Sequence, residues 1–208
     1  MTLHEDRIAD LLIPFLNEIV LSRDKLENLR IYLDLLLKWN SKMNLTAVRS
    51  PEEIVARHFG ESLFAGISLF PKPKPESVID IGPGAGFPGI PIKIWNKAAD
   101  LILIESNQKK AVFLRELVRT LGLDEVRVEA ARAETTAKRA DLITVRAVER
   151  FEQILPTARG LLNPSGRLAL LIGEAQAKAA KNALPDFRWQ PRLPIPRSQN
   201  RILLVGNL

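Results

Sequence analysis

The stretch SVIDIGPGAGFPGIP, residues 77–91, decides the fold, because it reads as a strand, a glycine turn and the start of a helix. Val78, Ile79 and Ile81 form a short apolar run, typical of a strand buried on both faces of a parallel sheet. The glycines that follow allow a tight turn and a close approach of the backbone to a ligand. A proline just after them suits the first turn of a helix. The stretch therefore predicts a ligand-binding turn between a strand and a helix.

The glycine spacing favours a nucleoside ligand, although G-x-G-x-G alone is not specific. Gly82, Gly84 and Gly86 come two residues apart, whereas the dinucleotide fingerprint G-x-G-x-x-G places its third glycine one residue later. A second apolar run, residues 101–104, ends in Glu105. A carboxylate after the second strand suits hydrogen bonds from both hydroxyls of a ribose. The alternative is a turn that holds no ligand, and Glu105 argues against it.

Asp80 bears on which nucleoside cofactor is bound. It lies near the end of the first predicted strand, where its charge would repel a pyrophosphate and attract the positively charged amino-acid moiety of a cofactor. We therefore expect S-adenosylmethionine rather than NAD. An NAD-dependent oxidoreductase is the alternative.

The composition excludes several classes of protein. The chain has 208 residues, no cysteine and two histidines, so we expect no disulfide and no metal site. No apolar run approaches the roughly 18 residues of a membrane span, and the acidic N-terminus is unlike a signal peptide. The net charge of +6 suits a nucleic-acid partner without requiring one. We expect a cytoplasmic protein and, since no dimer seam is evident, a monomer.

The first third of the chain predicts a helical cap. Residues 3–21 have apolar side chains at helical spacing, interrupted by Pro14, and a second helix follows Ser22 and ends near residues 39–40. Ser50 begins a short third helix. Alternating prolines in residues 70–75 indicate an extended linker. We therefore divide the chain into a helical cap, 1–70, and a second domain, 71–208.

The remainder of the chain alternates strands and helices. Further strands are expected at 125–129, 141–145 and 168–172, helices at 107–121, 151–162 and 175–183, and a closing antiparallel pair at 189–193 and 202–205. This order predicts an α/β fold with a mostly parallel sheet and helices on both faces. The candidate ligand residues all follow predicted strands and should share one crevice: Gly82, Glu105, Ala133, Glu134 and Arg146.

Several motifs carry a resemblance to a known family. They are Lys38-Trp39-Asn40, Asn44-Leu45-Thr46, Arg57-His58 with Ser62, the segment 80–91, and Arg146-Ala147. With these motifs the chain resembles the glucose-inhibited division protein B family over nearly its whole length. The resemblance implies a Rossmann-like class I methyltransferase fold that uses S-adenosylmethionine. It implies methylation of N7 of a guanine in the 530 loop of 16S rRNA (guanine 527 in the family), in naked rRNA or in the small ribosomal subunit.

The resemblance also implies site residues. Cofactor contacts are expected from Asp80, Gly82, Gly84, Gly86, Phe87, Glu105, Ala133, Glu134 and Arg146. Arg146 and His58 would position the reacting groups, and RNA contacts are expected from Asn44, Arg57, Arg132 and Arg201.

The chain departs from the family pattern at three positions. Glu61 and Glu105 stand where aspartate is common, and Ile172 stands where a lysine is expected. The last departure removes one expected substrate contact, for which Arg167 is a candidate replacement.

The implied chemistry needs no catalytic acid or base. Guanine N7 carries a lone pair and no proton, so alignment and exclusion of water suffice. The sequence therefore leaves a third hypothesis open, an RNA-binding module that holds the cofactor without catalysis. Tyr32 and Trp39 are expected in the core rather than stacked on bases.

Overall fold

The computed structural model describes residues 3–148 and 150–208 and contains one eight-stranded sheet. The strand order is β3-β2-β1-β4-β5-β8-β6, and β7 also pairs with β8. The strands are β1 (Ser77–Ile81), β2 (Asp100–Ile104), β3 (Val126–Glu129), β4 (Ala140–Arg146), β5 (Leu162–Gly173), β6 (Arg188–Trp189), β7 (Leu193–Pro194) and β8 (Arg201–Asn207). The first five strands in this order pair in parallel, whereas β8 is antiparallel to β5. The predicted α/β fold with a mostly parallel sheet is confirmed.

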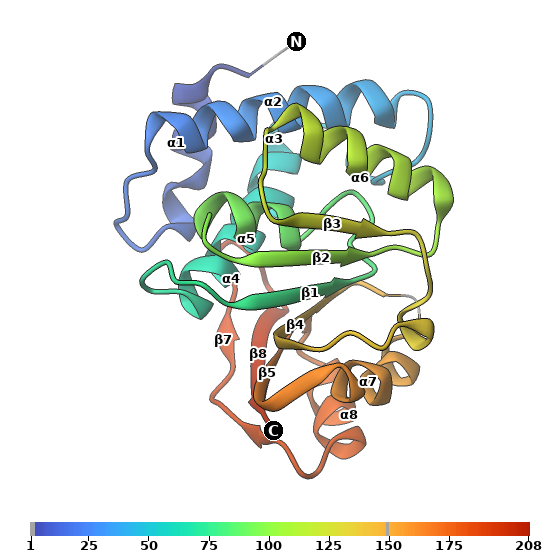
Figure 1. Ribbon diagram of the computed structural model, residues 1–208. Coiled ribbons are helices and arrows are strands. Elements are labelled where there is room, and N and C mark those ends of the chain that lie inside the picture. The colour runs from blue at the N-terminus through green and yellow to red at the C-terminus, as the bar shows by residue number, and fades with distance from the viewer. Residues whose placement is uncertain (1–2, 149) are drawn as a thin grey trace.

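Helices cover both faces of this sheet, as the apolar strands require. Those before the sheet are α1 (Glu5–Leu12), the 3₁₀ turn η1 (Ile13–Phe15), α2 (Arg23–Asn40), α3 (Pro51–Ile54), the π-helix η2 (Val55–Gly60) and α4 (Glu61–Leu69). Those that follow are α5 (Gly89–Trp95), α6 (Gln108–Thr120), the 3₁₀ turn η3 (Ala133–Thr135), α7 (Phe151–Gly160) and α8 (Gln176–Ala183). Figure 1 shows α2 and α6 on one side of the sheet and α7 and α8 on the other.

The helical cap shares its core with one face of the sheet. Leu33 of α2 and Phe59 of η2 belong to the same buried apolar cluster as Val78 and Leu103 of the sheet. A second cluster, on the other face, joins Ile79 and its neighbours to α7 and α8. The division of the chain at residues 70–71 stays a prediction, and packing continues across it.

The ends of some elements differ from the predicted ends. Pro14 ends the first helix early, because a proline cannot donate the hydrogen bond that a longer helix needs, and η1 follows in its place. Residues 163–166, between the predicted helix and the predicted strand at 168–172, lie inside β5, where the pairing shifts from Ala140–Leu162 to Leu142–Arg167. Ser165 has a φ of +64° there. An irregularity of this kind lets a strand continue through a turn-like sequence.

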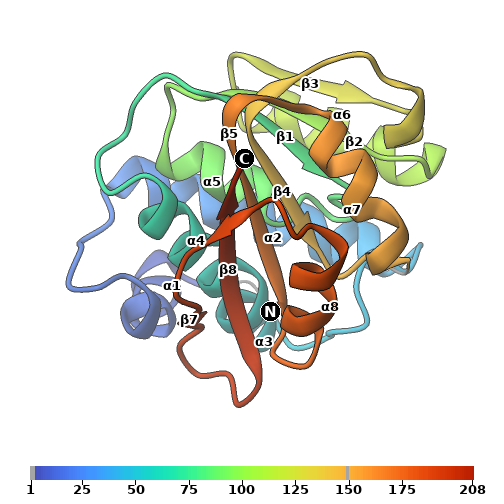
Figure 2. The same ribbon diagram turned by 90° about the horizontal axis from the view of Figure 1, so that it is seen from below.

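The C-terminal stretch forms an edge of the sheet. Its closing pair is confirmed as antiparallel, but it divides into two short strands, β6 and β7, which both pair with β8. Figure 2 shows β8 beside β5, with α8 on one side and α4 on the other.

Candidate functional site

The glycine turn begins where β1 ends, and the cap holds it in place. Gly86 has a φ of +102°, and a Cβ added there would lie 2.5 Å from the Tyr32 hydroxyl oxygen. That hydroxyl donates a hydrogen bond to the Ala85 carbonyl over 2.5 Å. Position 86 must therefore be glycine for two reasons, its left-handed backbone and the proximity of Tyr32.

Asp80 anchors the helix that follows the turn. Its side chain is buried and accepts hydrogen bonds from the Gly89 amide over 2.7 Å and from the Thr144 hydroxyl over 2.9 Å. Burial raises the pKa of Asp80 to about 7. The carboxyl group lies beneath the turn and not among the residues that line the adjacent cavity. Its direct contact with a cofactor stays a prediction.

Glu105 has the acceptor capacity that a ribose requires. One carboxylate oxygen accepts a hydrogen bond from the Gly84 amide over 3.0 Å, and the other accepts one from the Asn107 amide over 2.8 Å. A carboxylate offers about four acceptor positions, so each oxygen keeps a further one. The two hydrogen bonds also tie the glycine turn to the start of α6. The residues present therefore fit a nucleoside, with Glu105 held rigid beside the turn.

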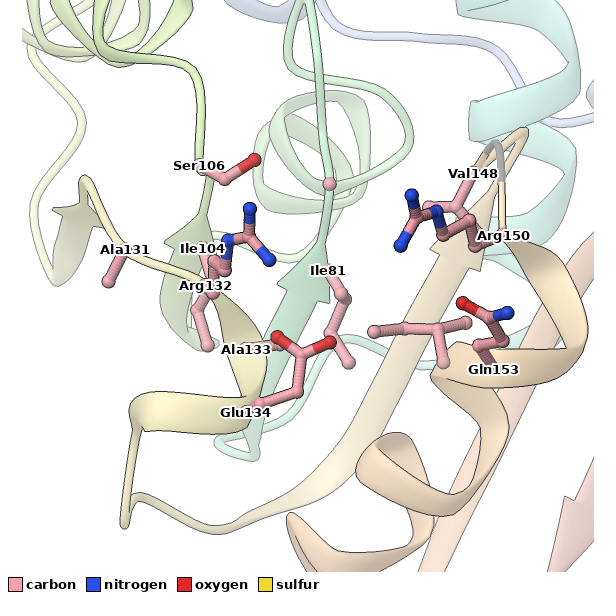
Figure 3. A pocket seen from close by; sticks show the side chains of 12 residues that line it. Ile81, Ile104, Ser106, Ala131, Arg132, Ala133, Glu134, Val148, Arg150 and Gln153 are labelled. Carbon is pink, nitrogen blue, oxygen red and sulfur yellow. The ribbon is translucent and has the colours of Figure 1, made fainter.

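A cavity of about 390 Å³ opens at the carboxyl ends of β1 and β2, where parallel α/β sheets bind ligands. It is lined by Ile81, Gly82, Ile104, Ser106, Ala131, Arg132, Ala133, Glu134, Val148, Arg150, Gln153 and Ile154. In Figure 3, Arg132 and Glu134 enter from one wall, and Arg150 and Gln153 from the other. The lining mixes apolar side chains with polar and charged ones, and such a mixture suits a heterocycle with a polar edge.

Arg146 ends β4 in a buried cluster of charged and polar groups. Its Nη2 atom lies 2.9 Å from Glu61 Oε2 and 3.1 Å from both the Arg57 carbonyl oxygen and His58 Nδ1. Arg201, the first residue of β8, places its Nε atom 3.1 Å from the same oxygen of Glu61. That contact is an ion pair without hydrogen-bond alignment, and among the described residues the Nε atoms of both arginines lack a hydrogen-bond partner.

His58 is neutral in this cluster, and its tautomer follows from its neighbours. Burial and the nearby Arg146 lower the pKa of His58 to about 3. An arginine can only donate, so Nδ1 must accept and the proton must lie on Nε2. Nε2 then donates to the Thr46 hydroxyl over 2.8 Å. His58 is therefore held as a positioned acceptor and not as an acid.

Aromatic rings connect this cluster to the glycine turn. Phe87 stacks on Tyr32, with ring centroids 5.3 Å apart, and lies 4.9 Å from the His58 ring and 5.5 Å from that of Phe59. The Arg146 guanidinium lies 5.8 Å from the centre of the Phe87 ring. Phe87 therefore joins the predicted cofactor residues to the predicted positioning residues.

The predicted RNA-binding residues are spread over three segments. Asn44 is exposed in the loop after α2 and accepts a hydrogen bond from Arg49, and Arg57 pairs with Glu53 at the surface. Arg132 lines the cavity, and Arg201 belongs to the buried cluster. Their contacts with RNA stay predictions.

The structure also contradicts one expectation and adds residues that sequence reasoning missed. Arg167 cannot replace a lysine at position 172, because Ile172 is buried near the other end of β5 while Arg167 pairs with Glu76 over 2.6 Å. The missed residues are Arg150 and Gln153 of the cavity wall and Tyr32 beneath the turn. Tyr32 lies on the apolar face of a predicted helix, which hid its polar role, and nothing in the local sequence marks the other two.

The described residues contain no group of three or more histidine, aspartate or glutamate side chains that could hold a metal ion. Within the same part of the chain, no helix combines the length and the apolar character needed to cross a membrane.

Solved structures show which fold this is. A ribosomal protein L11 methylase from Lactobacillus delbrueckii subsp. bulgaricus superposes with a TM-score of 0.61 at 19% identity, over 73% of this chain and 78% of that one. A methyltransferase from Pyrococcus furiosus gives 0.60 at 16% identity, over 70% and 81%. The Rossmann-like methyltransferase fold is thereby confirmed.

Sequence comparisons show the family. Residues 25–189 match the family model described as "GidB: rRNA small subunit methyltransferase G". The ribosomal RNA small subunit methyltransferase G of Stenotrophomonas maltophilia is 43% identical over 68% of this chain and 66% of its own length. That of Bacillus cereus is 34% identical over 90% and 84%. The chain belongs to the rRNA small subunit methyltransferase G family.

Proposed function

We propose that this protein methylates N7 of a guanine in the small-subunit rRNA, with S-adenosylmethionine as the methyl donor. The observation that carries the proposal is the position of Arg146. It stands at the end of β4 beside Phe87, two residues before Val148 of the cavity wall. The cavity and a buried, positioned guanidinium thus lie at the same edge of the sheet, which supports the proposal. By analogy with the family, the target is guanine 527 in the 530 loop.

The reaction divides the work between cofactor and protein. S-adenosylmethionine supplies an electrophilic methyl group on its sulfonium. Gly82 and Glu105 would hold the nucleoside part, with Ala133 and Glu134 at the adenine. No side chain has to remove a proton from guanine N7, which agrees with a His58 imidazole that has a pKa of about 3 and is already held by two neighbours.

Arg146 is suited to hold the target base. Glu61, His58 and the Arg57 carbonyl all engage Nη2, and they fix the plane of the guanidinium. Among the described residues its buried Nε has no hydrogen-bond partner. A donor in this position matches guanine O6, which neighbours N7, or an adjacent phosphate.

The test is methyl transfer mapped to a single atom. Purified protein is incubated with methyl-labelled S-adenosylmethionine and either naked 16S rRNA or small ribosomal subunits that lack the modification. Borohydride reduction followed by aniline cleaves RNA at N7-methylguanine, so one strand break in the 530 loop is the expected result. Label without a break at guanine would overturn the proposed atom.

A variant separates catalysis from binding alone. Gly82→Asp adds a side chain whose Cβ would lie 3.0 Å from Val148 Cγ1, on a backbone with a φ of +66°. We expect methyl transfer to be lost and RNA binding to be retained. Wild-type protein that binds both cofactor and RNA without transferring a methyl group would instead support the non-catalytic module.

The same proposal covers the oligomeric state, the need for a metal ion and the location of the protein. We infer a monomer that works without a metal ion in the cytoplasm, where ribosomal subunits are assembled. The chain's net charge of +6 supports an RNA substrate, since lysine and arginine contacts with phosphates supply much of RNA affinity.

A further inference from the structure

A groove lies between the last turn of α2 and the first half of α6, outside the site described above. Its volume is about 540 Å³, and it is lined by Lys38, Trp39, Lys42, Met43, Lys109, Val112 and Glu116. Trp39 and Met43 are half-buried, and Val112 beside them is 49% exposed, so three apolar side chains reach the surface of the groove. The groove therefore presents an apolar floor to solvent.

Three lysines surround this floor with positive charge. Lys38, Lys42 and Lys109 are exposed, and none of the ion pairs between described residues uses them. Glu116 is the one acidic residue among those that line the groove. The Trp39 ring is fixed from below by an edge contact with Phe113, with centroids 5.6 Å apart and planes at 64°. A rigid aromatic ring with ammonium groups around it suits a stacked base and its phosphates.

Two short segments link residues beside the groove to residues of the predicted active site. On one side, Asn40 accepts hydrogen bonds from the Leu45 and Thr46 amides, and Thr46 bonds His58. On the other side, the Asn107 amide donates a hydrogen bond to Glu105, and the Asn107 side chain caps α6 by accepting one from the Lys109 amide. Figure 1 shows that the end of α2 and the start of α6 lie at the edge to which the arrowheads of β1 and β2 point.

We propose that this groove binds single-stranded RNA next to the target guanine, with a base on Trp39 and Met43 and phosphates at Lys38, Lys42 and Lys109. The inference rests on the proposed function and assigns a surface to its substrate. Apolar and aromatic platforms flanked by basic side chains bind single strands without strict sequence preference. A guanine N7 target has to sit in an unpaired loop, so neighbouring unpaired nucleotides are available.

The first experiment reverses the charge of two of the lysines that surround the groove. The double variant Lys42→Glu/Lys109→Glu is compared with wild type for the Kd of an RNA fragment that contains the 530 loop, over a range of salt concentrations. We expect a Kd at least about tenfold higher and a log–log salt slope smaller by about 1.4, since each lost single-strand phosphate contact removes about 0.7. S-adenosylhomocysteine affinity and the methyl-transfer rate at saturating RNA should not change.

The matched control is Lys178→Glu/Lys181→Glu on α8, two exposed lysines on the opposite face of the sheet. It should leave the RNA affinity near the wild-type value. Equal losses in both double variants, or no loss in the groove variant, would overturn the proposal. Loss of binding to an acidic peptide with RNA binding intact would assign the groove to a protein partner instead.

The second experiment tests whether a base stacks on Trp39, and it needs no charge reversal. RNA should quench the tryptophan fluorescence of wild type, and Trp39→Phe should remove most of this quenching. Quenching that persists in Trp39→Phe would place the base elsewhere. This experiment measures RNA binding and not methyl transfer. A result against the groove can therefore be told apart from a result against the proposed function.

Discussion

Glu61 shows how one side chain organises the site. It is 3% exposed, it ion-pairs with Arg146 and Arg201, and it comes from the first turn of α4 in the cap. A single carboxylate thus joins the cap to β4 and β8. The glutamate side chain reaches far enough for one of its oxygens to lie against both arginines.

Removal of this charge should destabilise the protein. Glu61→Gln leaves the buried Arg146 and the half-buried Arg201 without their counter-ion, and we expect the free energy of unfolding to fall by about 3 kcal/mol. Glu53→Gln, which breaks an exposed pair with Arg57, is the control and should cost less than about 1 kcal/mol. Urea denaturation of both variants checks the difference. Equal, small losses would show that the Glu61 cluster does not hold the cap.

The depressed pKa of His58 predicts a pH dependence of stability. An unfolded histidine binds a proton near pH 6.5, while folded His58 stays neutral down to about pH 3. The unfolded state therefore gains protons first, and His58 lowers stability as the pH falls through this window. We expect wild type to lose about 1 to 2 kcal/mol more than His58→Gln between pH 7 and pH 5. Parallel curves for the two proteins, measured by urea denaturation, would mean that folded His58 titrates normally.

At the scale of elements, the glycine turn depends on a residue 54 positions earlier in the sequence. Tyr32 of α2 bonds the Ala85 carbonyl and stacks on Phe87. The cap helix thus shapes the loop that is expected to hold the cofactor. The local sequence around Tyr32 does not indicate this contact, because α2 has the pattern of an amphipathic helix with an aromatic residue on its apolar face.

This contact predicts coupling between two substitutions. Gly86→Ala brings a methyl group against the Tyr32 hydroxyl and strains a backbone with a φ of +102°. We expect S-adenosylhomocysteine affinity to fall at least about tenfold. Tyr32→Phe in the Gly86→Ala background should recover part of that loss, because the clash is removed and the strain remains. Additive effects of the two substitutions, measured by calorimetry, would contradict the coupling.

Much of the architecture could be predicted from the sequence, because β1, β2 and β4 are short and mostly apolar. Of the residues expected to share one crevice, Gly82, Ala133 and Glu134 line the cavity at the carboxyl edge of the parallel strands, whereas Glu105 and Arg146 are not among its lining residues. What could not be predicted depends on contacts between distant segments. Asp80 could be placed at a strand end, but its hydrogen bonds to Gly89 and Thr144 require the helix and β4 to be in position.

At the scale of the whole molecule, the cap and the sheet share one core. The first apolar cluster contains residues of α1, α2 and η2 together with residues of β1 and β2. The proline-rich segment at 70–75 is a linker in sequence, yet Phe70 is fully buried at its start. Separation of the two parts would expose a large apolar surface to water.

The shared core predicts a single unfolding transition. Near-ultraviolet circular dichroism reports on the packed Tyr32 and the tryptophans, and far-ultraviolet dichroism reports on all helices and strands. We expect the two urea-denaturation curves to coincide, as they do for a two-state protein. Two separate midpoints would show that residues 1–70 fold independently of the rest of the chain.

The most direct measurement is calorimetric titration of the protein with S-adenosylhomocysteine, S-adenosylmethionine and NADH. We expect the first two to bind at one site, Gly82→Asp to abolish this binding, and NADH not to bind. Binding of NADH without binding of the adenosyl compounds would contradict the methyltransferase assignment and the roles given to Phe87, Glu105 and Arg146.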